Sequence, residues 1–155
     1  MKRASRKKGP VVSKVVSYDG ITFASGLEKY MYISLKKNNI DFGYEVRTYE
    51  LLPSFVFTNN LVERQSNGKG EFINRGNKKV LNLKYTPDFE SYDFIIETKG
   101  RANDSFPLRW KMFKKFMMDN GDNRDLYKPQ NQKECDITIE HIIAKRLEES
   151  KTKKQ

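Results

Sequence analysis

The chain has 155 residues and carries 30 lysine and arginine residues against 20 aspartate and glutamate residues, for a formal net charge of +10. A hydrophobic content of 37% and an aromatic content of 12% exclude a disordered polypeptide and suit one domain with one core. The positive charge favours an anionic partner, with nucleic acid first and an anionic membrane surface second, and a ribosome-like or merely solvated basic protein is the alternative.

Residues 1–10, MKRASRKKGP, are predicted to form a basic N-terminal arm. Two roles fit such an arm: it lies along phosphates, or it serves only as a solubilising tail. The segment lacks the apolar core of a secretory signal, and no apolar run in the chain approaches the roughly 20 residues of a membrane span. We therefore expect a protein without a membrane partner.

Residues 11–24 predict a short strand, a turn at Asp19-Gly20 and a second extended piece. Ser25 then caps a helix, and Glu28 three positions later completes a capping-box pattern. A mostly apolar face follows at helical spacing, formed by Leu27, Tyr30, Met31, Ser34 and Leu35. Asn38-Asn39 is expected to end this helix.

Strand-forming residues dominate 43–57, with an interruption at Pro53. The segment 58–79 is rich in asparagine and glycine, which predicts a hairpin insertion. Residues 80–89 and 93–99 predict two further strands, joined by a turn at 90–92. Four tyrosines are interpreted as core or sheet residues: Tyr30, Tyr32, Tyr44 and Tyr49.

A second helix is expected after the cap candidates Asp104 and Ser105, with Pro107 in its first turn. Its apolar stripe runs to about residue 119 and comprises Leu108, Met112, Phe113, Phe116 and Met117. Trp110 lies off this stripe and is interpreted as partly buried packing rather than as a base-stacking residue.

A last core strand is expected at 126–128, followed by a third helix over 132–149, although CDITIEHII could instead begin as a strand. The inward face of this helix is predicted to comprise Cys135, Ile139, Ile142, Ile143 and Leu147. The order of elements predicts an α/β domain over residues 11–149, a mixed β-sheet flanked by helices, with a basic tail at 150–155.

Two residue types that each occur once limit the kinds of site that the chain can form. Cys135 is the only cysteine, so an internal disulfide and a thiolate zinc site are excluded, and the sequence suits a reducing cytoplasm. His141 is the only histidine and is interpreted as a helix-surface residue, which argues against a nuclease built on a histidine base. Neither a P-loop nor a dinucleotide-binding glycine motif is present.

Asp88, Glu97 and Lys99 are the candidate catalytic residues. If the turn centres on Ser91-Tyr92, Asp88 lies opposite Ile95, and Glu97 is its diagonal neighbour at roughly 7–8 Å between backbones. Two carboxylates across that gap could hold one Mg²⁺, with the Thr98 carbonyl as a further ligand, because Mg²⁺ prefers hard oxygen donors.

Strand alternation puts Lys99 on the same side as Glu97, where its charge could orient the attacking water or offset charge on the phosphate. The plainer alternative is a surface hairpin that carries an ordinary charge pair between Glu97 and Lys99.

Four motifs, D-G-I-T-F-A-S-G-L-E, Y-T-P-D-F, I-I-E-T-K-G and L-R-W-K-M-F, resemble the phage-associated PD-(D/E)XK nucleases. They are especially similar to phage endonuclease I, a Holliday-junction resolvase, and to small phage nuclease-like proteins, over roughly residues 18–52 and 84–118. The resemblance implies a restriction-endonuclease-like core of α-β-β-β-α-β order, and the hairpin insertion predicted at 58–79 departs from the compact pattern of that family. The resemblance also implies Mg²⁺ or Mn²⁺ dependence, cleavage that leaves a 5′-phosphate, and in some members a homodimer.

Carried over by position, the family's catalytic set is Glu28, Asp88, Glu97 and Lys99. Glu28 has two readings that are compatible: a helix carboxylate that holds a metal-bound water or a second ion, and the glutamate of a capping box. Five basic residues are candidate DNA contacts, against the alternative of a solvated surface: Arg101, Arg109, Lys111, Lys114 and Lys115.

The leading prediction is a metal-dependent DNA endonuclease, with branched DNA as one candidate substrate, located in the cytoplasm, or in the host cytoplasm if the protein is phage-encoded. Two alternatives stay open: a catalytically idle nucleic-acid-binding module, and a basic structural protein of a phage particle or nucleoid. The carboxylates argue against the idle module, because acids near phosphates weaken binding unless a cation bridges them.

Overall fold

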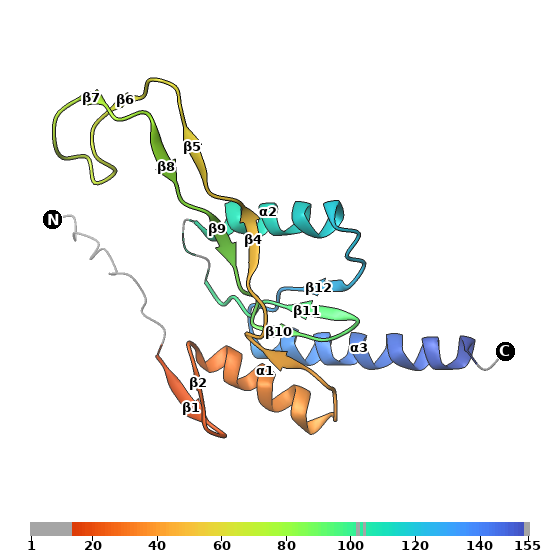
Figure 1. Ribbon diagram of the computed structural model, residues 1–155. Coiled ribbons are helices and arrows are strands. Elements are labelled where there is room, and N and C mark those ends of the chain that lie inside the picture. The colour runs from red at the N-terminus through yellow and green to blue at the C-terminus, as the bar shows by residue number, and fades with distance from the viewer. Residues whose placement is uncertain (1–13, 102, 104, 154–155) are drawn as a thin grey trace, which may run out of the picture. The chain divides into compact units, whose positions relative to one another are not determined.

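The computed structural model describes residues 14–101, 103 and 105–153 and contains both helices and strands, so the predicted α/β class is confirmed (Figure 1). The described strands form several small sheets, and none of these sheets closes into a barrel. The chain divides into two compact units. The first comprises residues 14–45, 88–101 and 124–153, and the second 46–87, 103 and 105–123. The predicted basic arm at 1–10 lies outside the described residues.

The first unit begins with a hairpin and a capped helix, as the sequence predicts. Strands β1 (Val16–Tyr18) and β2 (Ile21–Phe23) pair antiparallel. They are joined by Asp19 and Gly20, both at positive φ, which is the conformation of a tight hairpin turn. Helix α1 (Gly26–Lys37) follows, capped by Ser25, whose hydroxyl accepts a hydrogen bond from the Glu28 amide at 3.2 Å.

A four-stranded mixed sheet lies at the centre of the first unit, in the order β12-β11-β10-β3. Its strands are β3 (Gly43–Tyr44), β10 (Phe89–Glu90), β11 (Phe94–Ile96) and β12 (Asp125–Tyr127). The β10–β11 and β10–β3 pairs are antiparallel, whereas β11 and β12 are parallel. The last strand is therefore found within a residue of its predicted position.

The turn between β10 and β11 differs from the prediction. Phe89 pairs with Ile96 and Glu90 with Ile95, and the Ser91 amide donates to the Phe94 carbonyl at 2.9 Å. The two central turn residues are thus 92 and 93 rather than 91 and 92. In this register the residue that comes opposite position 88 is 97, so the predicted pairing of Asp88 with Ile95 is wrong.

Helix α3 (Gln132–Thr152) packs on α1 and completes the core of the first unit. It is helical from its first residue, capped by Asn131, so the alternative of an initial strand is wrong. It also continues past the predicted end at 149. Cys135, Ile139 and Ile142 are buried as expected, but Leu147 is 57% exposed because the helix extends beyond the core that would cover it.

The second unit contains a long antiparallel ribbon built from three successive strand pairs (Figure 1). These are β4 (Tyr49–Leu52) with β9 (Leu83–Tyr85), β5 (Phe55–Phe57) with β8 (Lys78–Val80), and β6 (Val62–Glu63) with β7 (Ile73–Asn74). The hairpin predicted for 58–79 is observed. The single strand predicted for 80–89 is wrong, because this segment is divided among β8, β9 and β10.

Helix α2 (Phe106–Asp119) packs against β4 within the second unit. The Asn103 side chain, rather than Ser105, accepts a hydrogen bond from the Phe106 amide at 3.0 Å, and the other predicted cap, Asp104, lies outside the described residues. Phe113 contacts the rings of Tyr49 and Tyr85, with centroids 5.1 and 4.5 Å apart.

Two expectations about side chains of α2 have opposite outcomes. Leu108 is 64% exposed, so its place in the predicted apolar stripe is wrong, and Phe106 is buried in its stead. Trp110 is partly buried and its ring stacks on that of Phe106, with centroids 5.6 Å apart, as its interpretation as a packing residue requires.

Over the described residues, no helix combines the length and apolar character needed to cross a bilayer.

Candidate active site

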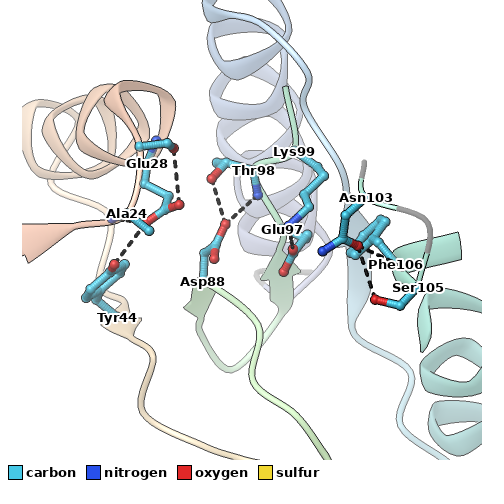
Figure 2. Close-up of polar contacts among 11 residues, drawn as sticks. Ala24, Glu28, Tyr44, Asp88, Glu97, Thr98, Lys99, Asn103, Ser105 and Phe106 are labelled. Atoms are coloured by element: carbon cyan, nitrogen blue, oxygen red, sulfur yellow. Dashed lines mark hydrogen bonds and ion pairs between the residues drawn. The ribbon is translucent and has the colours of Figure 1, made fainter. Parts of the chain in front are cut away.

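Asp88 and Glu97 come together at the end of the β10–β11 hairpin (Figure 2). The register that pairs Phe89 with Ile96 brings Asp88 opposite Glu97 one step further along. Direct neighbours across an antiparallel pair have Cβ atoms about 5 Å apart, closer than the diagonal spacing predicted from the sequence. Both side chains are nearly inaccessible to solvent, with 8% exposure for Asp88 and 4% for Glu97.

Main-chain hydrogen bonds hold both strands at this point. The Glu45 amide donates to the Asp88 carbonyl at 2.8 Å, which continues the β3–β10 pairing. The amides of Glu97 and Lys99 donate to the carbonyls of Tyr127 and Pro129, each at 3.0 Å. Since alternate amides of the 97–99 segment face the same neighbour, the side chains of Glu97 and Lys99 share one side of the strand, as predicted.

Thr98 orients the Asp88 carboxylate. Its amide and its hydroxyl both donate to Oδ2 of Asp88, each at 2.6 Å (Figure 2). Both donors use the same oxygen, which leaves Oδ1 as the atom that can accept a further ligand. Lys99 lies beside the second acid, with its Nζ 3.7 Å from Oε1 of Glu97.

Glu28 projects from the first turn of α1 and is 7% exposed. Its Oε2 accepts hydrogen bonds from the Ala24 amide and from the Tyr44 hydroxyl, both at 3.0 Å, and its Oε1 accepts from the Ser25 hydroxyl at 3.1 Å. The capping and site readings of Glu28 are therefore structurally compatible, because the cap fixes the same carboxylate that faces Asp88 in Figure 2.

The electrostatics of the cluster follow from burial of several acids together. Burial first, and then the charges of Glu97 and Glu28, raise the pKa of Asp88 to about 8, although the hydrogen bonds from Thr98 oppose this shift. Burial and the neighbouring Glu28 carboxylate also raise the pKa of Tyr44. Its phenol therefore stays protonated and keeps donating to Glu28.

The donor set suits a hard divalent cation that keeps most of its waters. In the parts of the chain that the structure describes, no three His, Cys, Asp or Glu side chains converge closely enough to form a metal site by themselves. Mg²⁺ does not need such a cage, because it is commonly bound through one or two carboxylates together with waters and substrate phosphates. Asp88 and Glu97 provide that pair, and a cation between them would offset the repulsion that raises the pKa of Asp88.

Helix α3 clamps the turn of the same hairpin. Arg146 donates two hydrogen bonds to Asp93, Nε to Oδ2 and Nη2 to Oδ1, both at 2.7 Å. Burial works to raise the pKa of Asp93, but the bonds and charge of Arg146 outweigh it and hold that pKa below its usual value. Arg124 similarly pairs with Glu90 at 2.9 Å. These two ion pairs fix the strands that carry Asp88 and Glu97.

The predicted DNA contacts fall into two groups. Arg101 belongs to the first unit and is exposed two residues after Lys99. The others are on α2 in the second unit, where Lys111, Lys114 and Lys115 are exposed and Arg109 is partly buried. Lys115 forms an ion pair with Asp119, which reduces its availability to a phosphate.

Two functional contacts were not anticipated from the sequence. Tyr44 was interpreted only as a core or sheet residue, and its hydrogen bond to Glu28 depends on a strand pairing 16 residues after the helix carboxylate. Thr98 was noted for its carbonyl, whereas its amide and hydroxyl make the contacts with Asp88. No local motif signals either interaction, because both depend on which strands become neighbours.

Comparisons with known proteins give one family. Residues 10–125 match the family model described as "Protein of unknown function (DUF1064)". No curated protein and no solved structure shows significant similarity to the chain. The match spans Glu28, Asp88, Glu97 and Lys99.

Proposed function

The chain belongs to the DUF1064 family, whose description assigns no activity, and from the acidic cluster we propose that this protein is a divalent-metal-dependent DNA endonuclease. The observation that carries the proposal is the convergence of Asp88, Glu97 and Lys99 at one end of a clamped hairpin. Two buried acids and one ammonium group on a rigid support suit the hydrolysis of a phosphodiester with a metal ion.

Each residue has a distinct part in the proposed mechanism. Mg²⁺ or Mn²⁺, when bound, supplies Lewis acidity and a water that is more easily deprotonated. Asp88 and Glu97 would hold the ion, with the Thr98 carbonyl as a proposed further ligand. Thr98 keeps the Asp88 carboxylate in one orientation through its two hydrogen bonds. Lys99 orients the attacking water or neutralises charge that develops on the phosphate.

Glu28 and Tyr44 complete the proposed arrangement. Tyr44 and the cap of α1 hold the Glu28 carboxylate in place, so it could accept a hydrogen bond from a water molecule in the site. A carboxylate at the first turn of a helix is also stabilised by the positive end of the helix dipole. Glu28 is therefore proposed to position water rather than to serve as a direct ligand.

The arrangement of strands supports the restriction-endonuclease-like core as the finer fold proposal. When the ribbon strands β4 to β9 are set aside, α1 is followed in the chain by β3, β10, β11, α2 and β12, and these four strands make up the mixed sheet. The parallel pairing of β11 with β12 needs a long connection between them, and the chain places α2 in it. This arrangement supports the proposal of the α-β-β-β-α-β order that the resemblance implies.

The proposal is tested by cleavage of supercoiled plasmid and of a four-way junction in Mg²⁺. Asp88→Ala and Lys99→Ala should each lower the cleavage rate by roughly 100-fold or more. Glu140→Ala, which removes an exposed acid on α3, should leave the rate unchanged. Metal-dependent cleavage that survives both site substitutions would refute the site, and a lack of cleavage across linear and branched DNAs would refute the activity.

Binding measurements distinguish the enzyme from an idle nucleic-acid-binding module. Ca²⁺ commonly occupies carboxylate sites, so it should tighten DNA binding relative to a chelator if the acids and a phosphate share a cation. Asp88→Asn should remove that difference. An idle module would bind DNA equally with and without the divalent ion.

A further inference from the structure

The ribbon of the second unit contains a groove that no part of the proposed catalytic mechanism uses. The groove has a volume of about 480 Å³ and lies among the β5–β8 strands and the loop beyond them. Its lining includes four basic residues, Arg64, Arg75, Lys78 and Lys79, one acidic residue, Glu63, and the apolar residues Phe57, Leu61 and Val80. We call this feature the hairpin groove.

The lining of the hairpin groove keeps a net positive charge, because its four basic residues face a single acidic one, Glu63. Residues 55–80 contain five basic residues, Arg64, Lys69, Arg75, Lys78 and Lys79, but only two acidic ones, Glu63 and Glu71. Within the described part of the chain, none of the four groove cations forms an ion pair with a carboxylate. Like charges gathered without counterions repel one another, and a polyanion relieves that repulsion.

Main-chain contacts hold the two arginines in place. The guanidinium of Arg75 donates from Nε to the Glu63 carbonyl at 3.1 Å and from Nη2 to the Glu71 carbonyl at 3.2 Å. Arg64 donates from Nη1 to the Gly70 carbonyl at 3.4 Å. Because carbonyls carry no net charge, these bonds orient the guanidinium groups without cancelling their charge.

The backbone beneath Arg75 is also fixed. Its amide donates to the Leu61 carbonyl at 2.7 Å, and Oδ1 of Asn74 accepts from the amides of Leu61 and Gly76 at 3.1 and 2.9 Å. A Cβ at Gly76 would lie 2.1 Å from the Asn59 carbonyl oxygen, so only glycine permits this close crossing of the two chains. The groove is thus formed by an ordered part of the hairpin.

We propose that the hairpin groove binds the sugar–phosphate backbone of nucleic acid. Arginine forks and lysine ammonium groups recognise phosphate oxygens, and the apolar lining can contact sugars. A second copy of the chain is a poorer occupant, because its own groove has the same sign of charge. The inference deepens the proposed function by naming where the substrate is held outside the acidic cluster, and it rests on that function only for the choice of DNA.

The experiment measures binding of a fluorescent 30-base-pair duplex by anisotropy, in chelator, over a series of salt concentrations. Lys78→Gln/Lys79→Gln is compared with Lys133→Gln/Lys151→Gln, which removes the same charge from exposed positions of α3. The groove variant should bind about tenfold or more weakly at 0.1 M salt, with a log–log salt slope smaller by about two. The α3 variant should resemble the wild type.

Two outcomes would overturn the inference. The first is a groove variant whose affinity and salt slope match those of the α3 variant. The second is a change in oligomeric state, measured by sedimentation, with unchanged DNA binding. A melting curve of each variant and the charge-preserving Lys78→Arg/Lys79→Arg, which should restore binding, guard against misfolding. Since the assay contains no divalent ion, its result is independent of cleavage, so either proposal can fail without the other.

Discussion

Asp88 is buried near two other carboxylates, those of Glu97 and Glu28. Its titration therefore makes the stability of the folded protein depend on pH. Its pKa of about 8 lies above the ordinary value of an aspartate, which the unfolded chain retains. The folded protein therefore binds more protons than the unfolded chain between about pH 4 and pH 8. Over that window the contribution of Asp88 to stability falls as pH rises, because the folded state must give up a proton that it holds favourably.

We predict that the melting temperature without metal decreases from pH 5 to pH 8 and that Asp88→Asn reduces this decrease. The asparagine oxygen can still accept both hydrogen bonds from Thr98, but it carries no charge to repel Glu97. Thermal melts in chelator across this range provide the measurement. A wild-type profile that rises with pH, or an Asp88→Asn profile that parallels the wild type, would contradict the assignment of this effect to Asp88.

Thr98→Val tests the orientation of Asp88 without removing a charge. Valine keeps the shape of threonine but loses the hydroxyl bond to Oδ2, while the amide bond remains. Loss of a contact that orients a metal ligand typically weakens metal affinity by about 10- to 100-fold. We expect a rise of that size in the Mn²⁺ concentration needed for half-maximal cleavage, with little change at saturating metal. Thr98→Ser, which retains the hydroxyl, should behave like the wild type.

The acidic and basic residues of the candidate site were predicted from the sequence, whereas the residues that reach this site only through strand pairing were not. Strand alternation and residue type group Glu97 with Lys99 in the sequence, whereas Asp88 joins them through the hairpin, whose turn was predicted one residue too early. Tyr44 carries no such signal, since its hydroxyl reaches Glu28 only through the β3–β10 pairing. Leu147 was misjudged for a related reason: helical periodicity shows which face is apolar but not how far the core extends.

Among the elements, the β10–β11 hairpin depends on its clamp to α3. The Asp93 side chain is 8% exposed, so removing its partner Arg146 would leave a nearly buried carboxylate without its two charged donors. We predict that Arg146→Met lowers the free energy of unfolding by about 2 kcal/mol or more. Lys145→Met is the matched control, because its pair with Asp125 is more exposed and should be worth less than about 1 kcal/mol. Equal effects in urea denaturation would argue against the clamp.

The ribbon of the second unit depends on a glycine rather than on an ion pair. An alanine Cβ at position 76 would clash with the Asn59 carbonyl, so the backbone must shift and carry Arg75 with it. We predict that Gly76→Ala weakens DNA binding in chelator and speeds proteolysis within 58–79. Gly26→Ala is the control, since a Cβ at that helix position meets nothing within 4 Å. Unchanged protection of the ribbon in Gly76→Ala would contradict this account.

The observed helices and strands show that helices were predicted more accurately than strands. Helix α1 was predicted with its Ser25 cap, and α3 was predicted to begin at 132, because cap residues and apolar periodicity are local. The single strand predicted for 80–89 is instead divided among three strands, because strand composition does not reveal the partner with which each segment pairs. The turn of the hairpin was displaced by one residue for the same reason, and that displacement moved the residue opposite Asp88 from 95 to 97.

At the scale of the whole molecule, the proposed catalytic residues and the proposed nucleic-acid-binding residues belong to different units of the chain. The acids and Lys99 belong to the first unit, whereas the hairpin groove and the cations of α2 belong to the second. The order of predicted elements indicated the α/β class, and composition gave the excess of positive charge. Neither indicated this division, since each unit is assembled from segments far apart in sequence. The single domain expected over 11–149 stays a prediction.

A divalent ion held jointly by Asp88 and Glu97 is the central feature of the proposed mechanism, and calorimetric titration with Mn²⁺ tests it most directly. Titrations in buffers of different ionisation enthalpy also count the protons released. We predict binding that releases about one proton at pH 7 and fewer at pH 9, since the raised pKa of Asp88 leaves it largely protonated at pH 7 in the metal-free protein. Asp88→Asn and Glu97→Gln should each abolish this binding, whereas Glu140→Gln should not. Mn²⁺ binding that is unchanged in both site variants would contradict the central claim.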